Sequence, residues 1–265
     1  MKRFLAATLL SILVTLLAAA VPASAATSLA AGPRIPVTRS TSSNWSGYAV
    51  VEGNLTNPGN YTVTDVKGEW IVPAVSKSHG STYSAIWVGI DGYSDSTVEQ
   101  IGTEQDWSGG AVYYAWYEMY PNASYLIPNA IYPGDKMTGE VSYASGQFTL
   151  TLSDSTQGWS FSISQTASSA LRQSAEWIVE APWLGKILPL ANFGTVTFTG
   201  ASATLGNTTG TISSSSWVHD AITMVDGTAT ATPSSLSTDG SSFSVAYSSS
   251  STQGGGGHGG NPHHK

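Results

Sequence analysis

Short runs of β-branched and aromatic residues, separated by Gly, Pro, Asn and Asp, recur every 8 to 14 residues along most of this chain. Such runs between such turn residues are typical of β-strands, and no window shows a sustained helical period. The thirteen strands predicted from this pattern cover residues 45–51, 61–72, 83–90, 97–102, 112–120, 137–144, 147–153, 159–165, 175–181, 193–199, 211–218, 221–226 and 243–248. So many short strands with tight turns predict an all-β fold in which two sheets pack together.

The two ends of the chain differ from this β-rich middle. The first 25 residues have a basic start, an apolar stretch and a small-residue A-S-A ending, which is the pattern of a secretory signal peptide. Residues 26–42 are predicted to be a short pro-segment or linker, and residues 43–248 to be the folded domain. The Gly- and His-rich tail, residues 249–265, is predicted to be disordered, with its histidines solvated rather than bound to a metal. We therefore expect a secreted, extracellular protein that is free of the membrane once the signal peptide is removed.

The charge is one-sided beyond residue 40. All 17 acidic residues but only six of the ten basic ones lie there, which gives this part a formal charge of −11 against −7 for the whole chain. Nucleic acids and anionic membranes are poor partners for such a surface. Only 10% of the residues are charged, against about 25% in an ordinary domain. Because little charge changes when the pH falls, the composition indicates tolerance of acid.

Several common catalytic signatures are absent from the sequence. It has no cysteine, no G-x-S-x-G elbow, no H-E-x-x-H motif and no D-T-G or D-S-G pair. His79 and His219 lie in the strand-rich part without a neighbouring signature, so a Ser-His-Asp triad has no support from spacing. The absence of cysteine also excludes disulfides, so that stability must come from packing. No metal site and no cofactor are expected.

Carboxyl groups instead stand among aromatic side chains on two of the predicted strands. One face of residues 112–120 carries Val112, Tyr114, Trp116, Glu118 and Tyr120, and the other carries Tyr113, Ala115, Tyr117 and Met119. A carboxylate flanked by Trp and Tyr is partly desolvated, which raises its pKa. On residues 175–180, Glu176, Ile178 and Glu180 share one face, while Ala175, Trp177 and Val179 face the core. These glutamates lie about 13–14 Å apart along a strand, so each needs a partner from a neighbouring strand unless both simply face solvent.

A glutamine near these carboxyl groups is a further candidate. Gln100 lies on the short strand predicted for residues 97–102. A glutamine takes part in catalysis only where its amide donates to a developing oxyanion and a carboxylate handles the proton. On the residues alone, Gln105 is an equal candidate.

Seven sequence blocks follow one another in the order of a known family. They are SNWSGYAV (43–50), EWIVP (69–73), WVGIDG (87–92), EQIG (99–102), AWYEMYP (115–121), AEWIVE (175–180) and FGTVTFTGA (193–201). In this order they resemble the eqolisins, glutamic peptidases known from acid-secreting fungi and with bacterial relatives. The resemblance implies an antiparallel β-sandwich of two roughly seven-stranded sheets, of concanavalin-like or jelly-roll type. It also implies an endopeptidase that cleaves polypeptides at acid pH without a cofactor, and a monomer is the default for a secreted hydrolase.

The resemblance assigns site residues as well. Gln100 and Glu180 match the catalytic Gln–Glu pair, with Glu176 as the fallback for the glutamate. Glu180 is expected to activate a water molecule, and Gln100 to stabilise the oxyanion. The positions expected to form the substrate-binding cleft are Trp45, Trp87, Asp91, Trp116, Glu118 and Tyr120. The chain departs from the family pattern at Tyr114, where an Asp is frequent, at Glu99, where an apolar residue is usual, and in residues 92–100, which are about one residue shorter.

Carbohydrate chemistry is the competing interpretation. Lectin-like sandwiches also present Trp, Tyr and paired carboxylates on a concave sheet, and a retaining glycosidase needs two carboxyl groups about 5–5.5 Å apart. Such an enzyme would use Glu176 or Glu118 with Glu180, and it would not need Gln100. A carbohydrate-binding module without catalysis is the third interpretation.

Overall fold

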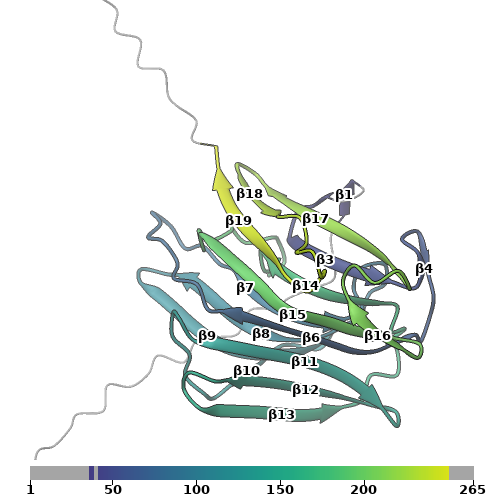
Figure 1. Cartoon of the computed structure of the whole chain (residues 1–265). Coiled ribbons are helices and arrows are strands. Elements are labelled where there is room, and N and C mark those ends of the chain that lie inside the picture. The colour runs from purple at the N-terminus through teal and green to yellow at the C-terminus, as the bar shows by residue number, and fades with distance from the viewer. Residues whose placement is uncertain (1–35, 39–40, 251–265) are drawn as a thin grey trace, which may run out of the picture.

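The computed structural model describes residues 36–38 and 41–250, and every regular element in this part of the chain is a β-strand (Figure 1). The strands are β1 (Pro36–Thr38), β2 (Thr41–Ser42), β3 (Trp45–Val51), β4 (Gly53–Asn54), β5 (Asn57–Pro58), β6 (Val63–Ile71), β7 (Ala85–Ile90), β8 (Val98–Trp107), β9 (Ala111–Tyr120), β10 (Tyr125–Ile127), β11 (Lys136–Ala144), β12 (Gln147–Asp154), β13 (Trp159–Gln165), β14 (Ser174–Glu180), β15 (Thr195–Leu205), β16 (Thr208–Thr211), β17 (Val218–Asp226), β18 (Ala229–Pro233) and β19 (Phe243–Ser249). None of the described residues forms a helix long and apolar enough to cross a membrane. The predicted signal peptide, most of the predicted pro-segment and nearly all of the predicted tail lie outside the described residues.

Seventeen strands are hydrogen-bonded into one sheet, and β4 and β5 form a separate pair. Neighbours in the large sheet follow the order β10, β9, β8, β7, β14, β3, β17, β18, β19, β15, β6, β11, β12 and β13, with β16 on β15, β2 on β17 and β1 on β2. All these pairings are antiparallel except the two-residue pairing of β2 with β17. The prediction of an all-β, antiparallel fold is confirmed.

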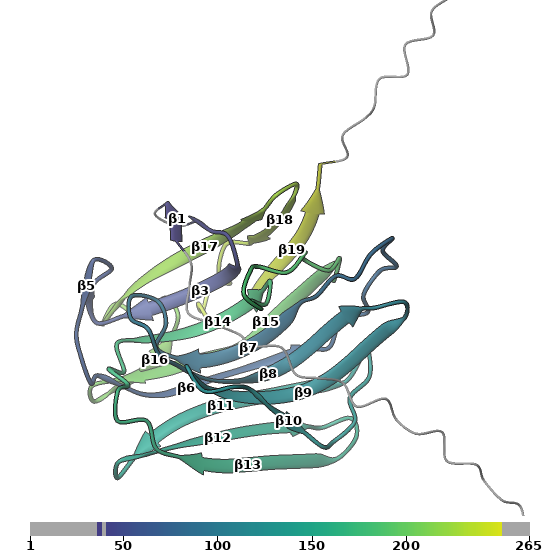
Figure 2. The ribbon, with the colours of Figure 1, turned by 180° about the vertical axis from the view of Figure 1, so that it is seen from behind.

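The prediction of two separate sheets is wrong. The sheet curls back on itself, so that β6 and β11 of one layer pack against β7 and β8 of the other (Figures 1 and 2). The layers stay joined through β17, β18, β19 and β15. The first part of β15 pairs with β19, and the rest pairs with β6 after a register shift between Thr199 and Ser202. Because a strand has two hydrogen-bonding edges, one long strand can continue both layers.

Side-chain alternation divides the apolar residues of β9 and β14 between two clusters. Tyr113, Ala115, Tyr117 and Met119 of β9 and Ala175, Trp177 and Val179 of β14 lie in or against the main core between the layers. Val112, Tyr114, Trp116 and Tyr120 of β9 and Ile178 of β14 belong to a second cluster on the opposite face, with Trp45 and Trp87. The alternation predicted for both strands is therefore confirmed. Burial of each large apolar side chain contributes about 1.5–3 kcal/mol.

Three of the predicted strands depart most from the structure. The strand predicted to end at Gly102 continues as β8 to Trp107, and the strand predicted to end at residue 199 continues as β15 to Leu205. Gly102 does not end its strand. It is a glycine because β8 passes close to β7 there: a Cβ would lie 2.3 Å from the carbonyl oxygen of Ile86 and 2.6 Å from Cβ of Trp87. The strand predicted over residues 211–218 is wrong, since the chain turns between β16 and β17.

Candidate active site

One face of the layer formed by β3, β14, β7, β8 and β9 carries the polar side chains of the candidate site. Glu118 of β9 lies opposite Gln100 of β8, and Ala85 of β7 lies opposite Glu104 of β8. Ala85 is in turn opposite Glu180 of β14. Because residues opposite each other in a sheet project to the same side, the amide of Gln100 shares this face with the carboxyl groups of Glu104, Glu118 and Glu180.

A short polar contact on this face joins Gln100 to Glu118. Gln100 Nε2 donates a hydrogen bond to Glu118 Oε2 at 2.8 Å, and both side chains are buried. The other oxygens of this pair, Gln100 Oε1 and Glu118 Oε1, have no hydrogen-bond partner in the described part of the chain. Buried polar atoms are nearly always paired in native proteins. These two atoms are therefore suited to bind a polar group of another molecule.

Glu180 is held by two side chains. Its Oε2 accepts a hydrogen bond from Trp87 Nε1 at 2.8 Å, and its Oε1 accepts one from Asn44 Nδ2 at 3.4 Å. Trp45, opposite Glu180 in β3, packs edge-on against Trp87 with ring centroids 4.9 Å apart. Trp87 thus positions the carboxyl group and Trp45 positions Trp87. Asn44 was missed by the sequence analysis, although it lies in the block that contains Trp45.

The protonation of Glu118 follows from its surroundings. Burial raises the pKa of Glu118 to about 9, the nearby Glu180 carboxyl acts in the same direction, and the hydrogen bond from Gln100 acts against them. Glu118 is therefore neutral in acid solution. A neutral carboxyl group can accept the Gln100 N–H at one oxygen and carry a hydroxyl donor at the other.

Further along β8 lies a pair of carboxyl groups that the sequence analysis missed. Glu104 and Asp106 are hydrogen-bonded to each other, and Asp106 also interacts with the Tyr114 hydroxyl and accepts the Ser84 N–H at 3.3 Å. Burial raises the pKa of Asp106 to about 7. The pKa of Glu104 is raised well above its usual range by burial, then by the charges of Asp106 and Glu180. Asp106 thus supplies a carboxyl group beside Tyr114, the position where relatives frequently carry an Asp.

Asp91 lies in a different group of carboxyl side chains, whose other members are Asp95, Glu99 and Glu176. Its oxygens accept the backbone N–H groups of Arg172 at 2.7 Å and Gln173 at 2.6 Å, which ties the end of β7 to the chain before β14. Burial raises the pKa of Asp91 to about 7, and the neighbouring Asp95 adds to this effect. The structure therefore does not bring Asp91 to the group around Glu180. Its contacts are those of a residue that fixes two loops.

Glu176, the fallback for Glu180, belongs to the group of Asp91. The register places Glu176 beside Gln100, with Gly89 between them. However, the pKa of Glu176 is raised well above its usual range by burial, and the charges that add to this effect are Asp91, Asp95 and Glu99. A hydrogen bond with the Ser174 side chain acts in the opposite direction. The charge that acts on Glu118, the partner of Gln100, is instead that of Glu180.

Trp116 and Tyr120 continue the face of β9 that carries Glu118. Trp116 lies opposite Gly102, and its buried indole nitrogen has no hydrogen-bond partner within residues 41–250. Tyr120 is half-buried and packs against the second apolar cluster. Six of the eight predicted site residues therefore lie together on this face, with Tyr120 at its edge and Asp91 elsewhere.

The chemistry available to this group is proton transfer and hydrogen bonding. No three His, Cys, Asp or Glu side chains are arranged to hold a metal ion in the part of the chain that the structure describes. Carboxyl groups can act as general acid or base, and amide and indole N–H groups can stabilise negative charge on oxygen.

The indole donor to Glu180 can be tested by Trp87→Phe. This change removes the hydrogen bond at Glu180 Oε2 but keeps an aromatic ring against Trp45. A hydrogen bond to a buried carboxyl group contributes about 1.5–3 kcal/mol, so kcat/KM for a reaction that uses Glu180 should fall by about 10- to 100-fold. The matched control is Trp217→Phe, which removes a buried indole bond to the Ile212 carbonyl and should lower the melting temperature without this loss of rate. Equal losses in the two variants would contradict the role of Trp87.

The fold and this face define an all-β protein with a site built from a glutamine and glutamates. The chain belongs to the peptidase A4 family, whose family model matches residues 43–247. The resemblance to the eqolisins is thereby confirmed.

Two curated proteins and one solved structure place the chain more closely. It is 33% identical to aspergillopepsin-2 of Aspergillus niger over 195 residues, which are 63% of this chain and 66% of that protein. It is 34% identical to scytalidopepsin B of Scytalidium lignicola over 143 residues, 52% of this chain and 51% of that protein. The chain therefore spans about half to two thirds of the length of these relatives. The fold matches that of scytalido-glutamic peptidase with a transition state analog inhibitor, with a TM-score of 0.65 and 26% identity over 78% of this chain and 98% of that one.

Proposed function

We propose that this protein is a secreted glutamic endopeptidase that hydrolyses polypeptides in acid, with Gln100 and Glu180 as its catalytic residues. The observation that carries the proposal is the arrangement on one face of the sheet. There the amide of Gln100 is held by Glu118, and Glu118 lies within electrostatic reach of Glu180. Family membership and the names of the relatives support peptide hydrolysis as the reaction.

Glu180 is the proton-transferring group of this mechanism. It binds a water molecule beside the scissile carbonyl, takes a proton as the water oxygen attacks, and later gives the proton to the leaving amine. Trp87 and Asn44 hold the two carboxyl oxygens from one side. Such fixed orientation lowers the barrier because the reacting atoms are already placed when the substrate binds. No side chain attacks the substrate, so no acyl-enzyme accumulates.

Gln100 stabilises the oxyanion. One N–H of its amide is donated to Glu118, which leaves the second N–H for the oxygen of the tetrahedral intermediate. Its Oε1 is available to orient the attacking water. An oxyanion donor of this kind contributes about 3–4 kcal/mol to catalysis. Because Glu118 is neutral in acid, it holds this amide without placing a second negative charge beside the oxyanion.

We assign the catalytic glutamate to Glu180 rather than Glu176 for two reasons. Glu180 has oriented hydrogen-bond donors at both oxygens, Trp87 and Asn44, whereas the charges that act on Glu176 are those of Asp91, Asp95 and Glu99. Glu180 also interacts with the carboxyl group that holds Gln100. The glycosidase alternative, Glu176 or Glu118 with Glu180, has no use for Gln100, whose amide is held on this face by Glu118.

The proposals on location and assembly rest on the sequence pattern. We propose that residues 1–25 direct export and are removed, that maturation falls within residues 26–42, and that the mature enzyme is a monomer. Polypeptides are the substrates, and the excess of acidic over basic residues beyond residue 40 disfavours nucleic acids as partners.

A digestion assay tests the proposed function. The purified enzyme is expected to degrade denatured casein and haemoglobin at pH 2–4 and to leave a panel of polysaccharides unchanged. Pepstatin, which targets paired aspartates, should have little effect. Release of sugars, or strong inhibition by pepstatin, would overturn the proposal.

A further inference from the structure

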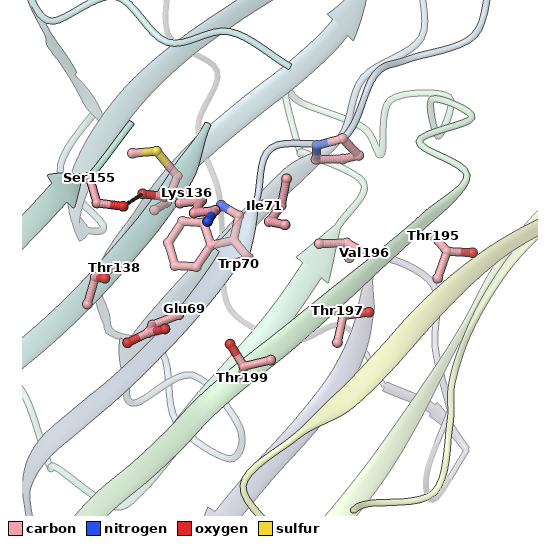
Figure 3. A pocket seen from close by; sticks show the side chains of 12 residues that line it. Glu69, Trp70, Ile71, Lys136, Thr138, Ser155, Thr195, Val196, Thr197 and Thr199 are labelled. Atoms are coloured by element: carbon pink, nitrogen blue, oxygen red, sulfur yellow. Dashed lines mark hydrogen bonds between the residues drawn. The ribbon is translucent and has the colours of Figure 1, made fainter. Parts of the chain in front are cut away.

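A pocket of about 590 Å³ opens on the layer that does not carry Gln100 and Glu180 (Figure 3). It is lined by β6, the start of β11 and the first half of β15. Glu69 and Thr199 lie close together at one end of the pocket, whereas Ile71 and Thr195 are separated at the other. The pocket is therefore the gap between two strands that diverge.

The pairing of the strands explains the gap. Glu69 of β6 and Thr199 of β15 are the last partners, and beyond them the two strands separate. From there β6 pairs only with β11, up to Ile71 opposite Lys136. The segment Thr195–Phe198 of β15 pairs only with β19. Each strand thus has one edge facing the gap without a partner strand in the described chain.

The backbone groups that face the gap can be identified from neighbouring bonds. Val72 donates to the Asp135 carbonyl and accepts from the Gly134 N–H, both at 2.9 Å, on the β11 side. Because successive residues of a strand direct their N–H and C=O groups to opposite edges, Ile71 directs its own groups into the gap. On the other strand, the Gly194 carbonyl accepts the Tyr247 N–H at 2.8 Å on the β19 side.

By the same alternation, the backbone N–H and C=O groups of Thr195 and Thr197 in β15 point toward β6. The two edges of the gap therefore present backbone donors and acceptors to each other. Backbone groups on an open strand edge readily pair with an added strand. The floor is apolar, formed by the buried Trp70, Met137 and Val196. Ile71, at the rim, is 53% exposed.

We propose that this gap is an exosite that binds an extended segment of the polypeptide substrate as an additional β-strand between β6 and β15. The inference rests on the proposed peptidase function, since it names a second place where the substrate is held. Both edges offer backbone hydrogen bonds, which recognise any polypeptide whatever its sequence, as an endopeptidase requires. Polypeptides unfolded by acid supply such extended segments.

The geometry also defines what binds best. Because β6 and β15 are antiparallel, the added strand runs antiparallel to one and parallel to the other. Side chains alternate along a strand, so every second residue of the segment rests on the apolar floor. The rim carries one acid and one base, Glu69 and Lys136, and therefore does not select for charge. The preferred segment is three to four residues with apolar side chains at alternate positions.

The first test is the variant Ile71→Pro. Proline removes the N–H that faces the gap. Because Val72 makes the bonds to the β11 side, the alternation along the strand leaves those bonds in place. With denatured casein as the substrate, KM should rise about fivefold, the equivalent of one lost backbone hydrogen bond. With a hexapeptide that occupies only the active site, kcat/KM should be unchanged. The control Ile71→Ala keeps the N–H, and its KM should stay within about twofold of wild type.

A competition test needs no variant, and it tests the exosite even if Ile71→Pro does not fold. A pentapeptide of alternating Val and Thr should inhibit casein digestion by the wild-type enzyme but not hexapeptide cleavage. The same peptide with N-methylated backbone nitrogens should not inhibit either reaction. Inhibition of both reactions, or of neither, overturns the exosite. A wild-type enzyme that cleaves neither casein nor the hexapeptide overturns the proposed function, and this inference with it.

Discussion

Replacing Glu180 with glutamine is expected to abolish peptide hydrolysis while leaving the protein folded. Glutamine has the shape of glutamate and can still accept the hydrogen bond from Trp87, but it cannot take a proton from water. General acid–base catalysis contributes about 10²- to 10⁴-fold to rates, so kcat/KM on denatured casein at pH 3 should fall by at least that factor. Circular dichroism and thermal melting should give wild-type values.

Gln100→Ala is the companion variant, and its expected loss in kcat is about 10²- to 10³-fold. The matched control is Gln105→Ala on the same strand. Gln105 points to the opposite face, where its Nε2 donates to Thr103 Oγ1 at 2.6 Å. Its removal should lower stability but not the rate of folded enzyme. Near-normal turnover by Gln100→Ala would contradict the assignment of the catalytic residues.

Glu176→Gln distinguishes the two candidate glutamates. With Glu180 as the catalytic residue, this variant should keep most of its activity. If Glu176→Gln is inactive and Glu180→Gln is active, the roles are reversed.

The second large expected effect is a loss of stability as the pH rises from 4 to 7. Buried carboxyl groups have raised pKa values in the folded protein: about 10 for Glu99, about 9 for Glu118 and about 7 for Asp91 and Asp106. Burial is the main cause for each. In the unfolded chain the same groups have pKa values of about 4. At a pH between about 4 and the raised pKa of each group, the folded state therefore holds a proton that the unfolded state has released.

The direction of the effect follows from this difference. Stability falls with pH wherever the folded state binds more protons than the unfolded state, by about 1.4 kcal/mol per pH unit for each such group. The full stability is therefore present below about pH 4 and declines toward neutral pH. Two such groups over two pH units amount to about 5 kcal/mol, against a typical total of 5–15 kcal/mol. Asp239, whose pKa is lowered to about 2 by hydrogen bonds from Ser237 and Ser241, has the opposite dependence, below about pH 4.

Urea denaturation between pH 3 and 7 measures this decline. The double variant Glu99→Gln with Glu176→Gln should flatten it and raise stability at pH 7, because each change removes a carboxyl group whose pKa is raised mainly by burial. Glu69→Gln, at an exposed position, is the control and should leave the slope as in wild type. A stability that rises steadily from pH 4 to 7 would show that these carboxyl groups are ionised in the folded protein.

The local sequence pattern predicted most of the strands and the faces on which several site residues lie. Because residues two apart in a strand share a face, the sequence correctly placed Trp116 with Glu118 on one face of β9, and Ile178 with Glu180 on one face of β14. The prediction failed at Gly102, where glycine was interpreted as the end of a strand. Glu104 and Asp106 continue the same alternation beyond it, and with the strand extended they would have been found. Glycine is needed at that position because the backbone passes close to Trp87, which is a tertiary contact.

The sequence by itself determined the all-β class, the faces of the strands and the family, because alternation and motif order are local properties of the chain. Tertiary structure decided which carboxyl groups meet. Glu180 lies 80 residues after Gln100, and the two come to one face only through the registers of β14 with β7 and of β7 with β8. The same is true of the single continuous sheet, which depends on β15 pairing with β19 and then with β6. Register between distant strands is set by the packing of the whole core, and no local pattern encodes it.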